Sequence, residues 1–207
     1  MTFYPRKATG NIQSDVEGEN QDRSFISHLQ WTAAEAHAAD TDGVLPFETD
    51  LGTGAANTIT TGITNPPSPR NITATVDDVT GDDADIKAVQ VVITGTNIDD
   101  EVITETLPIF TVNASGSVVG SKAFKTVTQI VIPAGDTPYD VITSIGYGDK
   151  LGLPYARETL PCIAAYLATV LESTAATLAA SATAIESNTI DLNSALNGTQ
   201  VDAYLVV

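Results

Sequence analysis

The sequence predicts a mainly β protein, an antiparallel β-sandwich or barrel-like domain with an extended N-terminal arm. Three observations support this fold class. Short runs that alternate apolar with polar residues, or consist of β-branched residues, recur between residues 71 and 145. Residues typical of turns separate these runs, and small and β-branched residues dominate a chain of which only 17 % is charged. Short strands divided by turns at such intervals are typical of antiparallel sandwiches and barrels.

The central domain, predicted over 56–154, contains most of the expected strands. Three prolines fix φ and predict a stiff, extended connector over 65–71. Three glycines and a proline predict that 146–154 forms turns and ends the domain. Turn residues lie at 80–83, 95–97, 99–100, 113–116 and 133–136. The predicted strands are 56–62, 71–76, 88–94, 102–107, 111–112, 117–119, 124–132 and 139–145.

Residues 1–55 are predicted to form the N-terminal arm. The first 23 residues are polar, mixed in charge and without periodicity, which is typical of a segment ordered only when something holds it. A weak apolar stripe at helical spacing then predicts a short helix over 24–39, with Ser24 as its N-cap. The alternative for 24–39 is an extended segment laid across a partner. The stripe consists of Phe25, Ile26, Leu29, Ala33, Ala36 and Ala38.

Residues 155–207 are predicted as a C-terminal extension that returns to the sheet or to a neighbouring subunit. Ala and Leu in 159–185 would suit a helix, but the frequent Thr and Ser weaken that interpretation. We therefore expect extended structure there, with a helix as the alternative. A turn at 197–198 precedes a final predicted strand at 201–207, which pairs with the chain's own sheet or with a neighbour's.

The charge balance restricts the class of partner. Nine basic and 26 acidic residues give a formal net charge of −17, whereas nucleic-acid binding needs a positive surface that displaces counterions. We expect no nucleic acid as partner, but a protein surface with positive patches. No apolar run has the length of a membrane span, and 1–11 lacks the apolar core of a secretory signal. We therefore expect no membrane partner, and synthesis in the cytoplasm.

The residues capable of chemistry form no catalytic or zinc-binding pattern in the sequence. His28 and His37 lie nine positions apart, unlike the two histidines of a zinc-binding helix, and we interpret them as surface residues. Cys162 lies in an apolar stretch, and we interpret it as a buried, unreactive thiol. The sequence therefore predicts no catalytic residue, no cofactor and no enzymatic activity.

Acidic residues gather in two predicted turns. If both turns lie at one edge of the sheet, their carboxylates could together bind calcium, which prefers oxygen ligands. Their spacing does not match an EF-hand loop, and solvated turns are commonly acidic, which is the simpler interpretation. Aromatic residues make up only 6 % of the chain, which argues against the sugar-binding cleft of a glycosidase. The calcium candidates are Asp77, Asp78, Asp82, Asp83, Asp85, Asp99 and Asp100.

Six segments of the sequence, taken together and in their order along the chain, carry a resemblance to a known group of proteins. They are GITNPPSPRNIT at 62–73, VITGTN at 92–97, EVITET at 101–106, GSKAFKTV at 120–127, GYGDKLGLP at 146–154 and SNTIDLNSALN at 187–197. In this order they resemble motifs of a group of tailed-bacteriophage structural proteins that are encoded among head genes. The resemblance implies a virion component of the capsid decoration or stabilisation type.

From this resemblance we expect the chain on the exterior of the capsid, after synthesis in the host cytoplasm. Its expected partners are the major capsid protein and further copies of itself, with a trimer as the expected oligomer. The arm and the proline-rich connector would then lie over neighbouring subunits. A tail, neck or fibre-base protein is the alternative function, and a carbohydrate-binding module is the second alternative.

Overall fold

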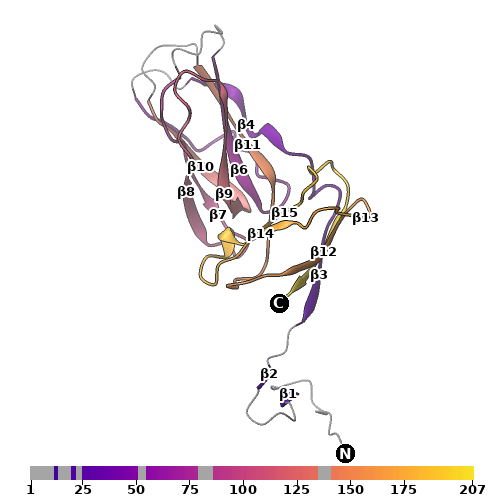
Figure 1. Cartoon of the computed structure of the whole chain (residues 1–207). Coiled ribbons are helices and arrows are strands. Elements are labelled where there is room, and N and C mark those ends of the chain that lie inside the picture. The colour runs from indigo at the N-terminus through magenta and orange to yellow at the C-terminus, as the bar shows by residue number, and fades with distance from the viewer. Residues whose placement is uncertain (1–11, 14–19, 22–24, 51–54, 79–85, 135–140) are drawn as a thin grey trace, which may run out of the picture.

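The computed structural model describes residues 12–13, 20–21, 25–50, 55–78, 86–134 and 141–207. Over this part of the chain the structure is almost entirely antiparallel β, with one 3₁₀ turn, η1, and no α-helix. The predicted fold class is therefore confirmed (Figure 1). No helix in the described ranges has the length and apolar character that would let it cross a membrane.

The largest sheet lies at the centre of the fold and contributes to both hydrophobic cores. Its strands follow the order β14-β15-β11-β6-β9, and β4 also pairs with β11. Its strands are β4 (Asp40–Asp50), β6 (Arg70–Asp78), β9 (Gly116–Phe124), β11 (Val141–Gly152), β14 (Thr177–Ala179) and β15 (Thr189–Asp191), and η1 (Ile185–Ser187) precedes β15.

A four-stranded sheet of order β5-β10-β7-β8 packs against β6, β9 and β11 (Figure 1). Its strands are β5 (Asn57–Ile59), β7 (Val92–Thr96), β8 (Val102–Thr106) and β10 (Thr126–Ile132). The first hydrophobic core fills the space between the two sheets and includes Ile72, Ile93, Phe124, Ile130 and Ile145. Alternate residues of each strand point into it, as expected for strands with one buried face.

A second four-stranded sheet joins the two ends of the described chain. Its order is β13-β12-β16-β3, and the C-terminus lies beside β3 (Figure 1). The strands are β3 (Ile26–Trp31), β12 (Cys162–Leu167), β13 (Val170–Leu171) and β16 (Val201–Val206). A second core, which includes Trp31, Leu151, Ile190, Val201 and Leu205, lies beneath this sheet. Strand β11 contributes to both cores and so connects them. A separate two-stranded sheet joins β1 (Ile12–Gln13) and β2 (Asn20–Gln21).

The helix predicted over 24–39 is wrong over its described residues, 25–39. Ile26–Trp31 form β3, which pairs with β16 from Ile26 opposite Val206 to Trp31 opposite Val201. The exposure of β3 alternates along the strand, with Leu29 and Trp31 on the less exposed face and Ile26 on the exposed one, so the helical stripe was coincidental. A single helical turn follows, in which the Ala36 amide donates to the Thr32 carbonyl. Residues 26–50 of the predicted arm thus form β3 and β4 within the body.

The turn predicted over 146–154 is also wrong, because β11 continues to Gly152. A side chain at Gly146 would lie 1.8 Å from the Asp40 carbonyl oxygen, and one at Gly148 would lie 2.6 Å from Asn71 Nδ2. These glycines therefore let β4 and a buried asparagine approach the strand closely. The glycines of this segment thus permit close packing within a strand, whereas the sequence suggested that they form turns.

The proline-rich connector packs within its own chain. The Asn65 side chain accepts a hydrogen bond from the Val127 amide, and the Ser68 hydroxyl donates to the Glu35 carbonyl. The Pro69 carbonyl accepts from Gly152, 2.8 Å away. The polar groups of this segment thus hold it against the body of its own chain, and its expected contact with a neighbouring subunit stays a prediction.

Most predicted strands are confirmed. The segments at 71–76, 102–107, 117–119 and 124–132 coincide largely with β6, β8, β9 and β10, and the short strand expected in 56–62 is β5. The prediction at 111–112 is wrong, since Asn113 has a φ of 55° within a turn there. Extended structure over 159–185 and a final strand at 201–207 are confirmed, and the final strand pairs within its own chain.

Candidate functional site: the outer face of the terminal sheet

The two histidines occupy different parts of the fold. His28 lies on β3, where its Nε2 donates to Asp202. His37 lies before β4, and its Nδ1 is 3.3 Å from the hydroxyl of Tyr147. Cys162 is partly buried on β12, and burial raises the pKa of its thiol, which lowers its reactivity as a nucleophile.

The two acidic turns lie at opposite ends of β6. Asp78 ends β6 and pairs with Val141, whereas Asp100 forms an ion pair with Lys125, next to Phe124, which pairs with Arg70 at the start of β6. At about 3.3 Å per residue, the nine residues of β6 separate these ends by roughly 25 Å.

The structure therefore does not bring Asp77 and Asp78 together with Asp99 and Asp100 around one cation. Within the described ranges, no three side chains of the metal-binding types form a group. The remaining calcium candidates, Asp82, Asp83 and Asp85, lie outside the described residues.

The outer face of the sheet β13-β12-β16-β3 carries an ordered set of side chains, which we call the outer face. Opposite it, the inner-face residues of the same strands belong to the second core. The register places the outer-face residues in three rows across the strands. The rows are Ile26 with Val206; His28 with Tyr204 and Ala164; and Gln30 with Asp202, Tyr166 and Leu171.

Aromatic rings occupy the centre of the outer face. The rings of His28 and Tyr204 are stacked, with centroids 4.6 Å apart and planes 5° from parallel. The ring of Tyr166 stands at 80° to that of Tyr204, 6.1 Å away between centroids. The two tyrosine rings therefore stand nearly at right angles to each other. The ring of His28, on the neighbouring strand β3, stacks on the ring of Tyr204.

Asp202 is held in place by three neighbours. Its Oδ1 accepts from His28 Nε2 at 2.7 Å and from Gln30 Nε2 at 3.0 Å, and its Oδ2 accepts from Gln200 Nε2 at 2.8 Å. The hydrogen bonds from Gln200, His28 and Gln30 hold the pKa of the Asp202 carboxyl below its ordinary value, against the opposing effect of burial. The carboxylate is thus oriented and stays ionised under mildly acidic conditions.

A shallow hollow lies beside this carboxylate and is lined by Tyr166, Thr169, Asp202 and Tyr204. The turn between β12 and β13 supplies Thr169. Both turn residues, Ala168 and Thr169, have positive φ angles, of 50° and 68°. A two-residue hairpin turn of this kind favours Asn and Gly, and a β-branched residue there is strained.

Exposed apolar residues are frequent on the sheet that carries the hollow, and the register places two of them, Ile26 and Leu171, on the outer face. Nine large hydrophobic side chains are exposed among the described residues, and five of them lie on or directly beside this sheet. Exposed apolar side chains grouped on one sheet are a feature that interaction surfaces share. The five are Phe25, Ile26, Ile163, Val170 and Leu171.

Sequence reasoning missed this face because its residues are far apart in the chain. His28 and Asp202 are separated by 174 positions, and neither belongs to a motif. The alternating pattern of 201–206 indicated a strand there, but nothing local in 26–31 showed that this segment is the strand that pairs with it.

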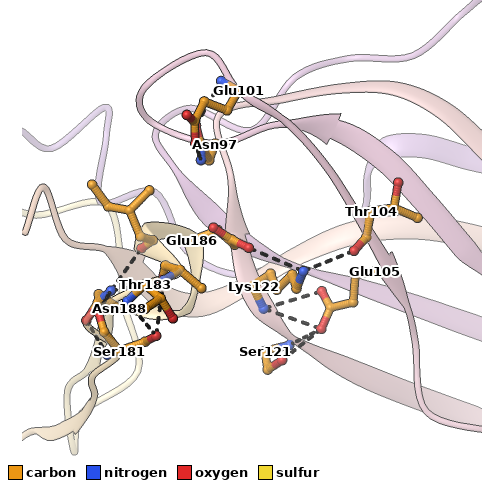
Figure 2. Close-up of polar contacts among 12 residues, drawn as sticks. Asn97, Glu101, Thr104, Glu105, Ser121, Lys122, Ser181, Thr183, Glu186 and Asn188 are labelled. Carbon is orange, nitrogen blue, oxygen red and sulfur yellow. Dashed lines mark hydrogen bonds and ion pairs between the residues drawn. The ribbon is translucent and has the colours of Figure 1, made fainter. Parts of the chain in front are cut away.

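A second polar cluster, shown in Figure 2, joins β8, β9 and η1. The Glu105 carboxylate accepts from the amides of Ser121 and Lys122, and Lys122 Nζ lies 3.3 Å from Glu186 Oε1. The buried Asn188 side chain donates to the carbonyls of Ser181, Ala184 and Ile185 and accepts from the Ser181 amide. These groups satisfy one another, so we assign this cluster to the fold rather than to a ligand.

Comparison with known proteins adds no relative, since no protein-family model, curated protein or solved structure matches the chain. The outer face therefore has to be interpreted from its own geometry.

Proposed function

We propose that the chain is a non-enzymatic structural protein of a bacteriophage particle, which binds the outer surface of the capsid and stabilises the head. The observation that carries the binding role is the outer face. It presents apolar and aromatic side chains on a sheet whose other side is packed against a core. Such a surface can bind a protein without rearranging, which lowers the entropic cost of association.

The location on a phage head is supported by the six sequence segments alone. In the fold, several of their residues are buried and hold the body together. Asn71 is fully buried, Gly148 accommodates its side chain, and Asn188 organises the loop before β15. The segments that carry the resemblance therefore include residues that specify the fold.

Stabilisation of a head would follow from many repeated contacts. Copies around a symmetry axis, such as the trimer proposed here, would engage several capsid subunits at once and gain avidity without stronger individual contacts. A formal net charge of −17 suits a capsid surface with positive patches.

The test is association with particles of the encoding phage that were prepared without this protein. We expect added protein to co-sediment with heads, to appear outside the shell by electron microscopy, and to raise the temperature at which DNA is released. Density at the neck or tail, or no association with particles, would contradict the proposal.

Two matched substitutions test the role of the outer face. Ile26→Asp puts a charge on the outer face, where Ile26 is 66 % exposed, and we expect it to weaken association with heads by at least about tenfold. Val102→Asp makes a comparable change at a side chain that is 76 % exposed on β8, in a different sheet, and we expect association to be unchanged. Equal behaviour of the two variants would show that another surface binds the head.

A further inference from the structure

The hollow beside Asp202 combines an oriented carboxylate with two aromatic walls. We propose that it binds one cationic side chain, an arginine or lysine, of the protein that covers the outer face. This inference rests on the proposed function in one respect, namely that a protein partner covers this face. It goes further by naming the chemical group that the partner inserts.

The carboxylate has capacity for one more donor. Asp202 Oδ1 already accepts two hydrogen bonds, from His28 and Gln30, whereas Oδ2 accepts one, from Gln200. A carboxylate oxygen has two lone pairs, so Oδ2 can accept a further N–H. The fixed geometry means that a partner does not have to order this side chain on binding.

The tyrosine rings favour a cation over a neutral group. Aromatic faces attract ammonium and guanidinium groups through the ring quadrupole, and a neighbouring carboxylate adds to that attraction. Tyr166 and Tyr204 form two walls at 80°, and Asp202 lines the same hollow. Together they would contact the charged end of a long side chain.

The charge around the hollow is not neutralised by the sheet itself. None of the four strands β3, β12, β13 and β16 contains lysine or arginine. Among the described residues, His28 is the only base that the structure pairs with Asp202. A cation from a partner would therefore complement both the local carboxylate and the overall charge of −17.

Backbone strain at the rim supports a binding role for the hollow. Thr169 lines the hollow at a φ of 68°, which threonine rarely adopts. Strain of this kind persists where the surrounding structure holds it and is concentrated at ligand sites. The strained turn places Thr169 beside the two tyrosines.

The test is a titration of the isolated, isotope-labelled chain followed by NMR. The probes are N-acetyl-arginine amide and N-acetyl-citrulline amide, which has a similar shape and no charge. We expect the arginine probe to shift the resonances of Tyr166, Thr169, Asp202 and Tyr204 at millimolar concentration, and the citrulline probe to bind about tenfold more weakly. Equal shifts with both probes would overturn the inference, as would shifts caused by N-acetylglucosamine and not by arginine.

Asp202→Asn is the decisive variant, because it keeps the shape of the side chain and removes its charge. We expect about a tenfold loss of affinity for the arginine probe, while Asp99→Asn, an exposed turn residue, retains wild-type affinity. A native spectrum of Asp202→Asn away from the hollow confirms that it folds. Unchanged affinity of that folded variant would overturn the inference. Since these probes involve no particle, failure here is distinguishable from failure of the particle association test.

Discussion

The guanidinium of Arg70 lies over the ring of Tyr147, with its Cζ atom 4.8 Å from the ring centroid, and no part of the arginine side chain is exposed. Its Nη1 donates to the His37 carbonyl at 2.5 Å, and its Nη2 donates to the Gly148 carbonyl. Burial is the main cause that lowers the pKa of Arg70 to about 10, opposed by the nearby Asp149. One side chain thus joins β6, β11 and the segment before β4.

Replacing Arg70 should therefore destabilise the fold strongly. Arg70→Ala leaves the buried Gly148 carbonyl and the partly buried His37 carbonyl without their donor, and we expect the free energy of unfolding to fall by about 3–5 kcal/mol. Arg70→Lys keeps the charge but lacks the planar fork that reaches both carbonyls, so we expect a smaller loss of about 1–3 kcal/mol. Urea denaturation measures both changes. Arg157→Ala, at an exposed position, should change stability by less than about 0.5 kcal/mol; an equal effect at the two sites would contradict this account.

The central strands could be predicted because their information is local. In β6 and β8, alternation or β-branching within one segment was enough to predict the strand. The strand β3 could not be predicted in this way, because it is fixed by pairing with β16 at the other end of the chain. The outer face depends on the same distant pairing, so neither its rows nor the hollow beside Asp202 could be assembled from the sequence.

The pairing of β3 with β16 predicts different outcomes for two N-terminal deletions. Deletion of 1–24 keeps β3, and we expect cooperative unfolding to be retained. Deletion of 1–45 removes β3 and the core residues Trp31 and Val44, and it leaves β16 with an unpaired edge. We expect that shorter chain to lose dispersed NMR resonances and cooperative urea unfolding. A native-like spectrum after deletion of 1–45 would show that β3 and its pairing with β16 are not needed for folding.

The Glu105 side chain on β8 links the edge strands of the two sheets, because it accepts hydrogen bonds from donors on β9. It is 9 % exposed and accepts from the Ser121 amide at 2.7 Å, the Ser121 hydroxyl at 2.9 Å and the Lys122 amide at 3.3 Å. Glu105→Gln removes the charge and replaces one acceptor oxygen with an NH₂ group, which faces the Lys122 amide if the Oε2 position is replaced and the Ser121 donors if the Oε1 position is. We expect a loss of about 2–3 kcal/mol in urea denaturation, and faster hydrogen exchange at Ser121 and Lys122. The exposed Glu158→Gln is the control, and a loss of similar size there would remove the support for this role.

Asp191 predicts a pH dependence of stability. Burial raises the pKa of its carboxyl, Lys150 opposes this effect, and Asp149 adds to it. Below the ordinary value of 3.8 the carboxyl is protonated in both the folded and the unfolded chain. As the pH rises through the raised folded pKa, the folded state has to ionise a partly buried group, so stability decreases. Asp191→Asn should therefore be more stable than wild type at pH 7, by less than about 1 kcal/mol for this half-exposed group.

The difference between Asp191→Asn and wild type should shrink between pH 7 and pH 4. Urea denaturation across this range measures the change. Asp99→Asn removes the same formal charge from an exposed turn and controls for the general effect of net charge. A difference for Asp191→Asn that does not vary with pH would exclude burial of the carboxylate as the cause.

Thr169 connects stability with the proposed binding role. Thr169→Gly relieves the strain of a positive φ, and we expect the free energy of unfolding to rise by roughly 0.5–1 kcal/mol despite the greater entropy of the unfolded glycine chain. Thr128→Gly, at an exposed position within β10, should instead lower it by a similar amount. If the strain serves to place Thr169 at the hollow, the more stable variant should bind the arginine probe more weakly than wild type. A variant that gains stability and keeps full affinity would show that the strained turn has no part in binding.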